Sequence, residues 1–145
     1  MNNKYICITN WQNYYKMIET NIWGVKKSSI SQLKKLHIGD YLLFYIKYGK
    51  WKNEKLDSSI YGIYKVDSDI FYDESEIFLY NNEKYPYRVK IKKIFQMDNP
   101  KSFRPLIPIL QMTKKSLKWG SIFMGKSIIR LETSDFDIIK KYLMN

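Results

Sequence analysis

Flat aromatic rings and cationic side chains are the groups of this sequence with the most distinctive chemistry. Lysine and arginine number 25 against 14 aspartates and glutamates, and Phe, Trp and Tyr make up 17% of the residues. The charge is concentrated, because residues 81–130 hold 12 basic residues and two acids, a net charge of +10. Cations bind phosphates and release their counterions, and aromatic rings stack on bases. Together these groups predict a nucleic-acid partner.

The basic residues of that segment are the candidates for phosphate contacts. Arg88, Lys90 and Lys92 occupy alternate positions of an expected strand over 87–95 and therefore share one of its faces. The full set of candidates is Arg88, Lys90, Lys92, Arg104, Lys114, Lys115 and Lys118. Alanine is absent and lysine far outnumbers arginine, which is typical of an AT-rich genome. Codon bias is therefore the alternative explanation of the total charge, but it explains the clustering less well.

Catalytic and metal-binding groups are scarce. The one histidine, His37, lies near the end of an expected helix, and the one cysteine, Cys7, lies within an expected apolar strand. A zinc site needs several soft ligands, which these two residues cannot supply. The acids of residues 67–76 are more typical of a solvated loop than of a cation site. We expect a protein that is not an enzyme and that has no cofactor and no metal.

Length and composition indicate one domain over residues 1–145. A single cysteine allows no intrachain disulfide, which favours the reducing cytoplasm. The first residues show no signal peptide, and the apolar run over 41–46 is too short to span a bilayer. We therefore expect no membrane partner, and we favour a monomer.

Apolar periodicity predicts short strands mixed with short helices. Strands are expected over 4–9, 41–46, 60–66, 87–95 and 127–131. Helices are expected over 10–19 with Asn10 as the cap, over about 30–36, and after a cap at Thr133 or Ser134. Three prolines argue against a central strand over 99–110. The predicted fold class is α+β, a strongly curved sheet or small barrel flanked by helices.

Seven short motifs in order give the sequence a family resemblance. They are Asn10-Trp11, Trp23-Gly24-Val25, Gly39–Tyr45, Gly62–Val66, Tyr85–Lys90, Phe103–Pro108 and Trp119–Gly125. Over about residues 4–140 the sequence resembles the EVE domain, and especially the small stand-alone EVE proteins of archaea and bacteria. The resemblance implies a PUA-like fold, a small curved β-barrel of about five or six strands flanked by short helices.

The resemblance also implies a base pocket. EVE domains are similar to YTH domains, which hold methylated adenine of RNA in an aromatic cage, and are themselves associated with modified bases, especially modified cytosines in DNA. In both, an aromatic residue follows the first helix, and Trp23 lies at that place here. The alternative is a buried tryptophan that pins the loop to the barrel. Polar base contacts are implied for Thr9, Asn10 and Asn13, with Asn10 favoured and a helix cap as its alternative.

The second wall of that pocket is less defined. Phe78 and Tyr80 lie about where the related readers place an aromatic residue, and neither is a tryptophan. Trp11 and Trp119 are the other candidates, unless they belong to the core. Trp51 lies in a lysine-rich segment, where it is a candidate for stacking on a base or for packing within the loop.

These observations predict a non-enzymatic nucleic-acid reader that holds a flipped, modified base, such as a methylated cytosine or adenine. Two alternatives remain open. One is a general PUA-like RNA-binding protein without selectivity for a modification. The other is an ASCH-like amidohydrolase acting on acylated cytidine, since such enzymes use lysine, glutamate and threonine. Lys26 or Lys27 would supply the lysine, but the sequence indicates no glutamate partner. DNA and RNA both remain open as the bound strand.

Overall fold

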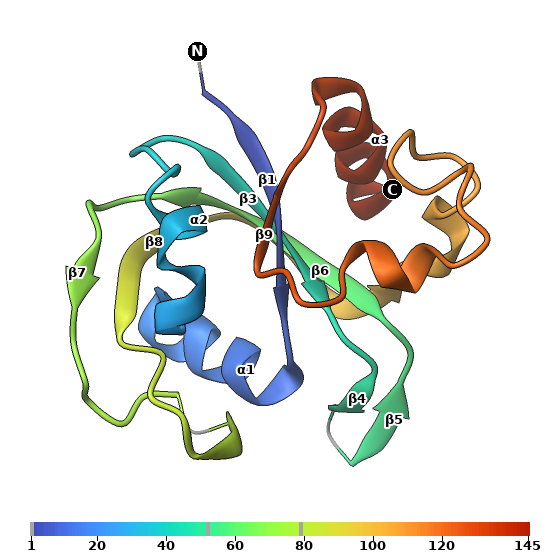
Figure 1. The fold of residues 1–145 in the computed structure, drawn as a ribbon. Helices are drawn as coiled ribbons and strands as arrows, with labels where there is room; N and C mark the ends of the chain where they lie inside the picture. Colours follow the sequence, from blue (N-terminus) through green and yellow to red (C-terminus); the bar gives the residue numbers. More distant parts are fainter. Residues whose placement is uncertain (1, 52, 79) are drawn as a thin grey trace.

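The computed structural model describes all residues except Met1, Lys52 and Leu79, together with the side chains of all but these and Trp51. Seven strands form one curled sheet in the order β2-β8-β6-β3-β1-β9, with β7 also paired to β8 (Figure 1). β1 and β3 run parallel, and the other pairs of this sheet are antiparallel. The strands are β1 (Lys4–Thr9), β2 (Ile22–Val25), β3 (Tyr41–Ile46), β6 (Ser59–Val66), β7 (Phe71–Tyr72), β8 (Tyr87–Ser102) and β9 (Ile128–Arg130). The α+β class and the curved sheet are as predicted.

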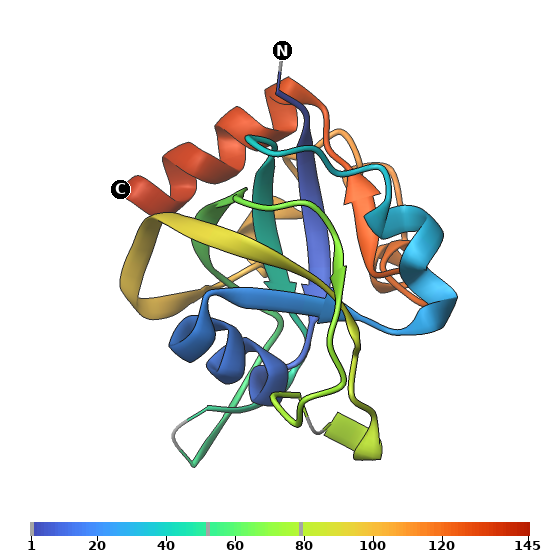
Figure 2. The ribbon, with the colours of Figure 1, turned by 90° about the vertical axis from the view of Figure 1, so that its left-hand side faces the viewer.

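Three helices and a small hairpin flank the sheet. The hairpin consists of β4 (Gly49–Trp51) and β5 (Glu54–Leu56), which pair only with each other. The helices are α1 (Trp11–Thr20), α2 (Ile30–Leu33) and α3 (Thr133–Met144). Single 3-10 turns cover Lys27–Ser29, Tyr80–Asn82, Arg104–Leu106 and Trp119–Ile122. β2 pairs with the first part of β8, and α1 lies beside β2 (Figure 2).

Helix ends follow the sequence only in part. Asn10 caps α1 as predicted, because its Oδ1 accepts a hydrogen bond from the Asn13 backbone N–H at 2.9 Å. The predicted cap at Thr133 or Ser134 is wrong, since the N-cap position of α3 is Glu132, which makes no side-chain cap bond. α2 is four residues long and thus shorter than the predicted helix.

β8 is longer than predicted and passes through Pro100. Ile60 and Ser59 of β6 pair with Lys101 and Ser102, whereas the next registered pair joins Gly62 to Gln96. Residues 97–100 therefore form a bulge outside the β6 ladder, and beyond Lys90 the other side of β8 has no registered partner in β2 or β7. Proline is tolerated here because no ladder bond needs its missing N–H.

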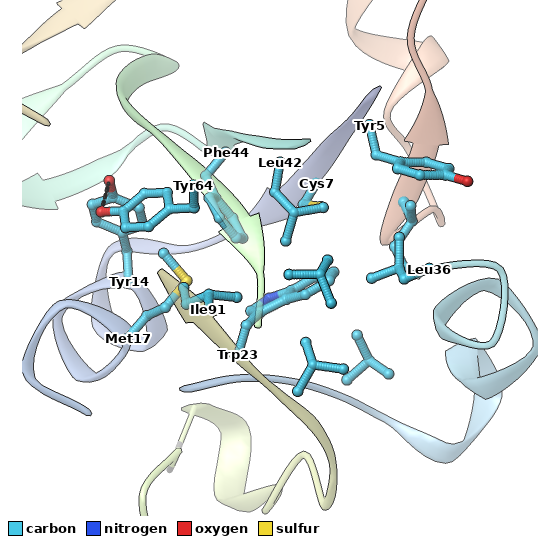
Figure 3. Close-up of a cluster of buried hydrophobic side chains, with 14 of the residues drawn as sticks. Tyr5, Cys7, Tyr14, Met17, Trp23, Leu36, Leu42, Phe44, Tyr64 and Ile91 are labelled. Atoms are coloured by element: carbon cyan, nitrogen blue, oxygen red, sulfur yellow. Dashed lines mark hydrogen bonds between the residues drawn. The ribbon is translucent and has the colours of Figure 1, made fainter. Parts of the chain in front are cut away.

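Both faces of the central strands are buried, and each face has its own core. In β3, Phe44 packs into the first core, whereas Tyr45 packs into the second. The first core lies between the sheet, α1 and β2, where Tyr14, Met17 and Trp23 meet Phe44 (Figure 3). Burial on both faces explains why β3 is a continuous apolar run rather than an alternating one.

The second core lies under α3 and residues 103–123. Phe136, Ile139 and Leu143 of α3 pack into it, as their helical spacing predicts. Cys7 belongs to the first core, and burial raises the pKa of its thiol well above the usual value. Within the part of the chain that the structure describes, no helix has the length and apolar character needed to cross a membrane.

Candidate base pocket

A pocket of about 300 Å³ lies where the start of α1 meets β2. The segments at residues 80–85 and 125–127 close its other sides. Five predicted base-contact residues line it, from three separate parts of the chain: Thr9, Asn10, Asn13, Trp23 and Tyr80. Of the predicted set, Trp11 and Phe78 do not line it.

The turn from β1 into α1 places the three polar residues together. β1 ends at Thr9, and the Asn10 cap then draws the backbone of Asn13 back toward the strand end. The Thr9 carbonyl accepts a hydrogen bond from the Lys47 backbone N–H at 2.9 Å, which holds the same corner to the end of β3. Asn10 is therefore a helix cap and a pocket residue at once, so the two interpretations of its sequence position do not exclude each other.

Trp23 is likewise both a core residue and a pocket residue. Its side chain is 3% exposed, and its ring meets Phe44 edge-on with ring centroids 5.4 Å apart. It nevertheless lines the pocket. Because the core behind it fixes the indole ring, the edge of Trp23 that lines the pocket is held rigidly in place.

Gly24 allows the neighbouring wall to come close. A Cβ atom at Gly24 would lie 2.5 Å from the carbonyl oxygen of Tyr85 and 3.1 Å from Cγ of Arg88. Real side chains do not tolerate such contacts, so any other residue here would push the 80–85 segment away from β2. The width of the pocket thus depends on this glycine.

Arg88 holds that segment from within, and this corrects its predicted role. The guanidinium is fully buried and donates hydrogen bonds to the carbonyl oxygens of Tyr85 (3.0 Å), Lys84 (2.9 Å) and Ser75 (2.6 Å). It also pairs with Asp73 at 3.4 Å. Burial lowers the pKa of Arg88, and the Asp73 carboxylate opposes that shift. Its donors are turned inward, so Arg88 is not available to a phosphate.

Phe78 is buried beneath this arginine. The guanidinium carbon of Arg88 lies 5.4 Å from the centre of the Phe78 ring. Phe78 is fully buried and supports the segment, rather than forming the predicted second wall. Trp11 is also in the first core, where it meets Tyr14 edge-on. Trp119 contributes to the second core, and the side chain of Trp51 lies outside the described residues.

Tyr85 and Tyr80 supply the aromatic wall instead. Tyr80 is partly exposed, whereas Tyr85 is nearly buried and has a left-handed backbone with φ of 48°. A bulky residue at positive φ is strained and is often found at binding sites. Burial raises the pKa of the Tyr85 hydroxyl, and a hydrogen bond with the Asn13 side chain opposes that shift. Tyr85 was not among the predicted pocket residues, although it stands next to Pro86 in one of the seven sequence motifs.

Asn13 leaves one polar atom in the pocket without a partner. Its side chain is 6% exposed, and its Oδ1 makes no hydrogen bond with any described residue. An unsatisfied buried amide oxygen costs roughly 1–3 kcal/mol. Since Asn13 lines the pocket, a ligand that donates an N–H would remove this cost.

Three lysines surround the mouth of the pocket. Lys26, Lys47 and Lys126 all line it. Lys26 pairs with Glu83 at 3.5 Å, and its ammonium lies 5.9 Å from the centre of the Tyr85 ring. These cations come from three distant parts of the sequence, so no local charge pattern reveals them.

The segment around Lys126 is tied to the rest of the site through Ser127. The hydroxyls of Ser29 and Ser127 are hydrogen-bonded at 2.8 Å, and the Ile8 backbone N–H donates to the Ser127 carbonyl at 2.9 Å. Gln32 Oε1 accepts from the backbone N–H of Ile128 at 3.1 Å. The third lysine of the rim is therefore held by bonds to β1 and to the α2 region.

The other predicted phosphate contacts lie away from this pocket, in three further places. Lys90 and Lys92 are exposed and line a second, larger hollow at the far end of α1. Arg104 pairs with Asp57. The remaining three, Lys114, Lys115 and Lys118, are exposed on the segment that covers the second core. The basic stretch of the sequence is thus not one surface of the folded chain.

Metal-binding geometry is not seen in the described residues, which contain no cluster of three or more His, Cys, Asp or Glu side chains placed to hold an ion. The acids of residues 67–76 include Asp73, which is engaged by Arg88. The pKa of Asp73 is lowered by hydrogen bonds from Ser75 and, to a smaller extent, by Arg88. Its role is to stabilise the segment beside the pocket.

Comparison with known proteins identifies a family. The EVE domain matches residues 3–142. A UPF0310 protein of Pyrococcus abyssi is 37% identical over 141 residues, which cover 96% of this chain and 98% of that protein.

Solved structures show the same fold at low sequence identity. Human THYN1, in complex with 5-methylcytosine containing DNA, is similar with a TM-score of 0.65 and 14% identity over 99% of each chain. The YTH domain of the Zygosaccharomyces rouxii MRB1 protein, in complex with N6-methyladenosine RNA, has a TM-score of 0.64 and 13% identity over 97% of this chain and 86% of that one. The fold is PUA-like, as the motifs implied. With its family match over nearly the whole length, this chain belongs to the EVE-domain family.

Proposed function

We propose that the protein binds a nucleic-acid strand and holds one flipped, modified base in the pocket between α1 and β2. The observation that carries the proposal is the unpartnered Oδ1 of Asn13, which lies in a pocket walled by Trp23 and Tyr85. The pocket volume of about 300 Å³ is at the lower end for small-ligand sites, which suits a single base better than a longer ligand.

The chemistry of the pocket favours bases with an exocyclic amino group. Adenine, cytosine and guanine each carry such a donor, and Asn13 Oδ1 is an acceptor without a partner among the described residues. The binding of 5-methylcytosine containing DNA by human THYN1 and of N6-methyladenosine RNA by the yeast YTH domain supports a modified form of one of these bases.

The free energies of base flipping, stacking and methyl burial are compatible with binding of a flipped, modified base. Flipping a base costs a few kcal/mol, and stacking on an aromatic ring returns roughly 1–3 kcal/mol. One buried methyl group adds only about 0.8 kcal/mol. The lysines at the rim, Lys26, Lys47 and Lys126, would supply further affinity through the flanking phosphates. Selectivity for the modification then depends on the closed shape of the pocket.

The test is a titration of matched oligonucleotides, in DNA and RNA, with unmodified, 5-methylcytosine and N6-methyladenine bases. We expect tighter binding of one modified strand. Asn13→Leu should weaken that binding roughly 10- to 100-fold, because a hydrogen bond in a buried site is lost. Gln12→Leu, on an exposed position of the same helix, is the control and should bind normally.

Equal affinity for modified and unmodified strands would contradict the proposed selectivity for a modified base and would favour general RNA binding. The unfolding free energy of Asn13→Leu should stay within about 1 kcal/mol of the unaltered protein, because the variant also removes an unsatisfied oxygen. A large loss of stability would attribute the binding defect to misfolding. In that case Tyr80→Ala, at a partly exposed position, provides the second variant.

A second candidate function, an amidohydrolase, has one structural observation in its favour. Lys26 has a glutamate partner after all, since Glu83 lies 3.5 Å from it across the pocket mouth. Both side chains are 45% exposed, however, and lysines that act as bases or nucleophiles are usually desolvated. Release of acetate from acetylated cytidine that Lys26→Gln abolishes would support the enzyme. No release at high protein concentration would leave the binding protein.

A further inference from the structure

We propose that the hollow at the C-terminal end of α1 is a second subsite for the same nucleic-acid strand, where three lysines hold phosphates about four nucleotides from the flipped base. This inference rests on the proposed function of the pocket. We call the hollow the distal groove and define it by Asn21, Tyr64, Lys90, Lys92 and Lys93, together with the residues around them.

The distal groove is large and cationic. It has a volume of about 680 Å³, and its three lysines, Lys90, Lys92 and Lys93, are exposed. None of the ion pairs between described residues involves these lysines. Asp67 also lines the groove, so its lining contains three lysines and one acid. An anionic ligand fits this balance of charge.

The floor of the groove is polar but carries no charge. The Tyr64 hydroxyl donates to Gln96 Oε1 at 2.8 Å and is hydrogen-bonded to the Tyr14 hydroxyl at 3.0 Å. Burial raises the pKa of Tyr64 to about 12, so the floor stays neutral at physiological pH. It would therefore neither repel a phosphate nor bind it tightly, and the lysines would set the affinity.

Helix α1 sets the distance between the polar end of the pocket and the distal groove. The polar pocket residues stand at the start of α1, and Asn21 stands just past its end. The helix has 10 residues and is about 15 Å long. At about 3.4 Å per stacked nucleotide, that length corresponds to about four nucleotides.

A length series tests the inference. Single strands would carry the preferred modified base with one to eight nucleotides added on either side, and their affinities would be measured at several salt concentrations. We expect affinity to rise when about four nucleotides are present on one side of the base and to gain little on the other side. The slope of log affinity against log salt should steepen at the same length, because phosphate contacts release counterions.

The variant is Lys90→Gln/Lys92→Gln/Lys93→Gln, and the matched control is Lys114→Gln/Lys115→Gln/Lys118→Gln, which removes the same charge from the segment over the second core. The groove variant should bind a long strand as weakly as a short one, with a salt slope smaller by about 2. The control should keep the length dependence. If both triple variants lose the dependence of affinity on strand length equally, the loss is caused by the lower net charge, and the distal groove is not a subsite.

The free modified nucleoside separates the two proposals. It should bind the groove variant as it binds the unaltered protein and should fail to bind Asn13→Leu. If the nucleoside binds but affinity does not depend on length, the pocket stands and the distal groove falls. If modified strands and nucleoside show no preference at all, the proposed function itself fails, and a length dependence without a preference would leave only a general strand-binding groove.

Discussion

Each core region has a buried polar side chain beside it, and the two differ in whether their oxygen atoms have hydrogen-bond partners. Asp135 at the start of α3 is 1% exposed and accepts hydrogen bonds from the backbone N–H groups of Gln111 (2.8 Å) and Met112 (3.1 Å). Asn13, beside the first core, has an Oδ1 with no such partner. In the second region the carboxylate of Asp135 is fully engaged by backbone donors. In the first region Asn13 Oδ1 has no donor among the described residues. We therefore propose that ligand binding depends on the first region and not on the second.

Aromatic rings pack against one another in both cores, and the pocket lies beside the first. In the second core, Tyr45 stacks on Phe123 with ring centroids 4.1 Å apart, and Phe103 meets both rings edge-on. Around the first core, Trp23 and Tyr85 reach the pocket. Rings whose faces are covered by other rings contribute packing energy, whereas rings beside a hollow keep surface for a ligand.

The largest effect is expected for Arg88→Met, which removes the buried cation that holds residues 73–85. The carbonyl groups of Tyr85, Lys84 and Ser75 lose their donor, and each such loss costs roughly 1–3 kcal/mol. The ion pair itself adds little, because the Asp73 side chain is 41% exposed. Chemical denaturation would measure the stability, and binding of the modified strand should be lost with it. A variant that is as stable as the unaltered protein would show that the segment does not depend on Arg88.

Asp135→Leu should cost on the order of 3 kcal/mol, because two backbone N–H groups lose their acceptor. It is the counterpart of Asn13→Leu, with the opposite outcome: lower stability and unchanged affinity, measured below the unfolding temperature. If the two variants gave the same pattern of effects, the proposed division between the two regions would be wrong.

Alkaline pH should weaken the first core by roughly 2 kcal/mol. The pKa of Tyr64 is raised to about 12 in the folded protein from an ordinary value of 10, mainly by burial. Its contribution to stability is thus complete below pH 10 and is lost as the pH rises toward 12. Denaturation at several pH values would show the decline, and Tyr64→Phe should reduce it. Tyr14, whose pKa is also raised by burial, would account for a decline that persists.

The smallest effect is expected for single exposed lysines over the second core. Lys114→Gln should change neither the unfolding free energy nor the affinity for the modified strand beyond about 0.5 kcal/mol. Lys47→Gln, at the pocket mouth, is its partner in the comparison and should reduce the salt slope by about 1. If log affinity depended equally on log salt in the two variants, Lys47 at the pocket and Lys114 over the second core would not differ in phosphate binding.

The sequence predicts the parts of this molecule whose signals are local. The central strands follow from their apolar runs, and the cap at Asn10 follows from its place before the helix. The pocket combines such a local feature with distant ones, since Lys26, Lys47 and Lys126 meet only after folding. Arg88 shows a related limit, because alternation along β8 gives its face but not the segment that covers it.

The parallel pairing of β1 with β3 has a consequence for the order in which the chain folds. Parallel strands need a crossover, and here residues 10–40 form it and carry α1, β2 and α2. Contacts between such distant strands form slowly, because the loop must close before they gain any stability. Asn13 and Trp23 lie within this crossover and so reach their places in the same step that joins the centre of the sheet. A chain that has not completed its sheet therefore has no pocket, so the proposed function predicts that partly folded molecules do not bind the base.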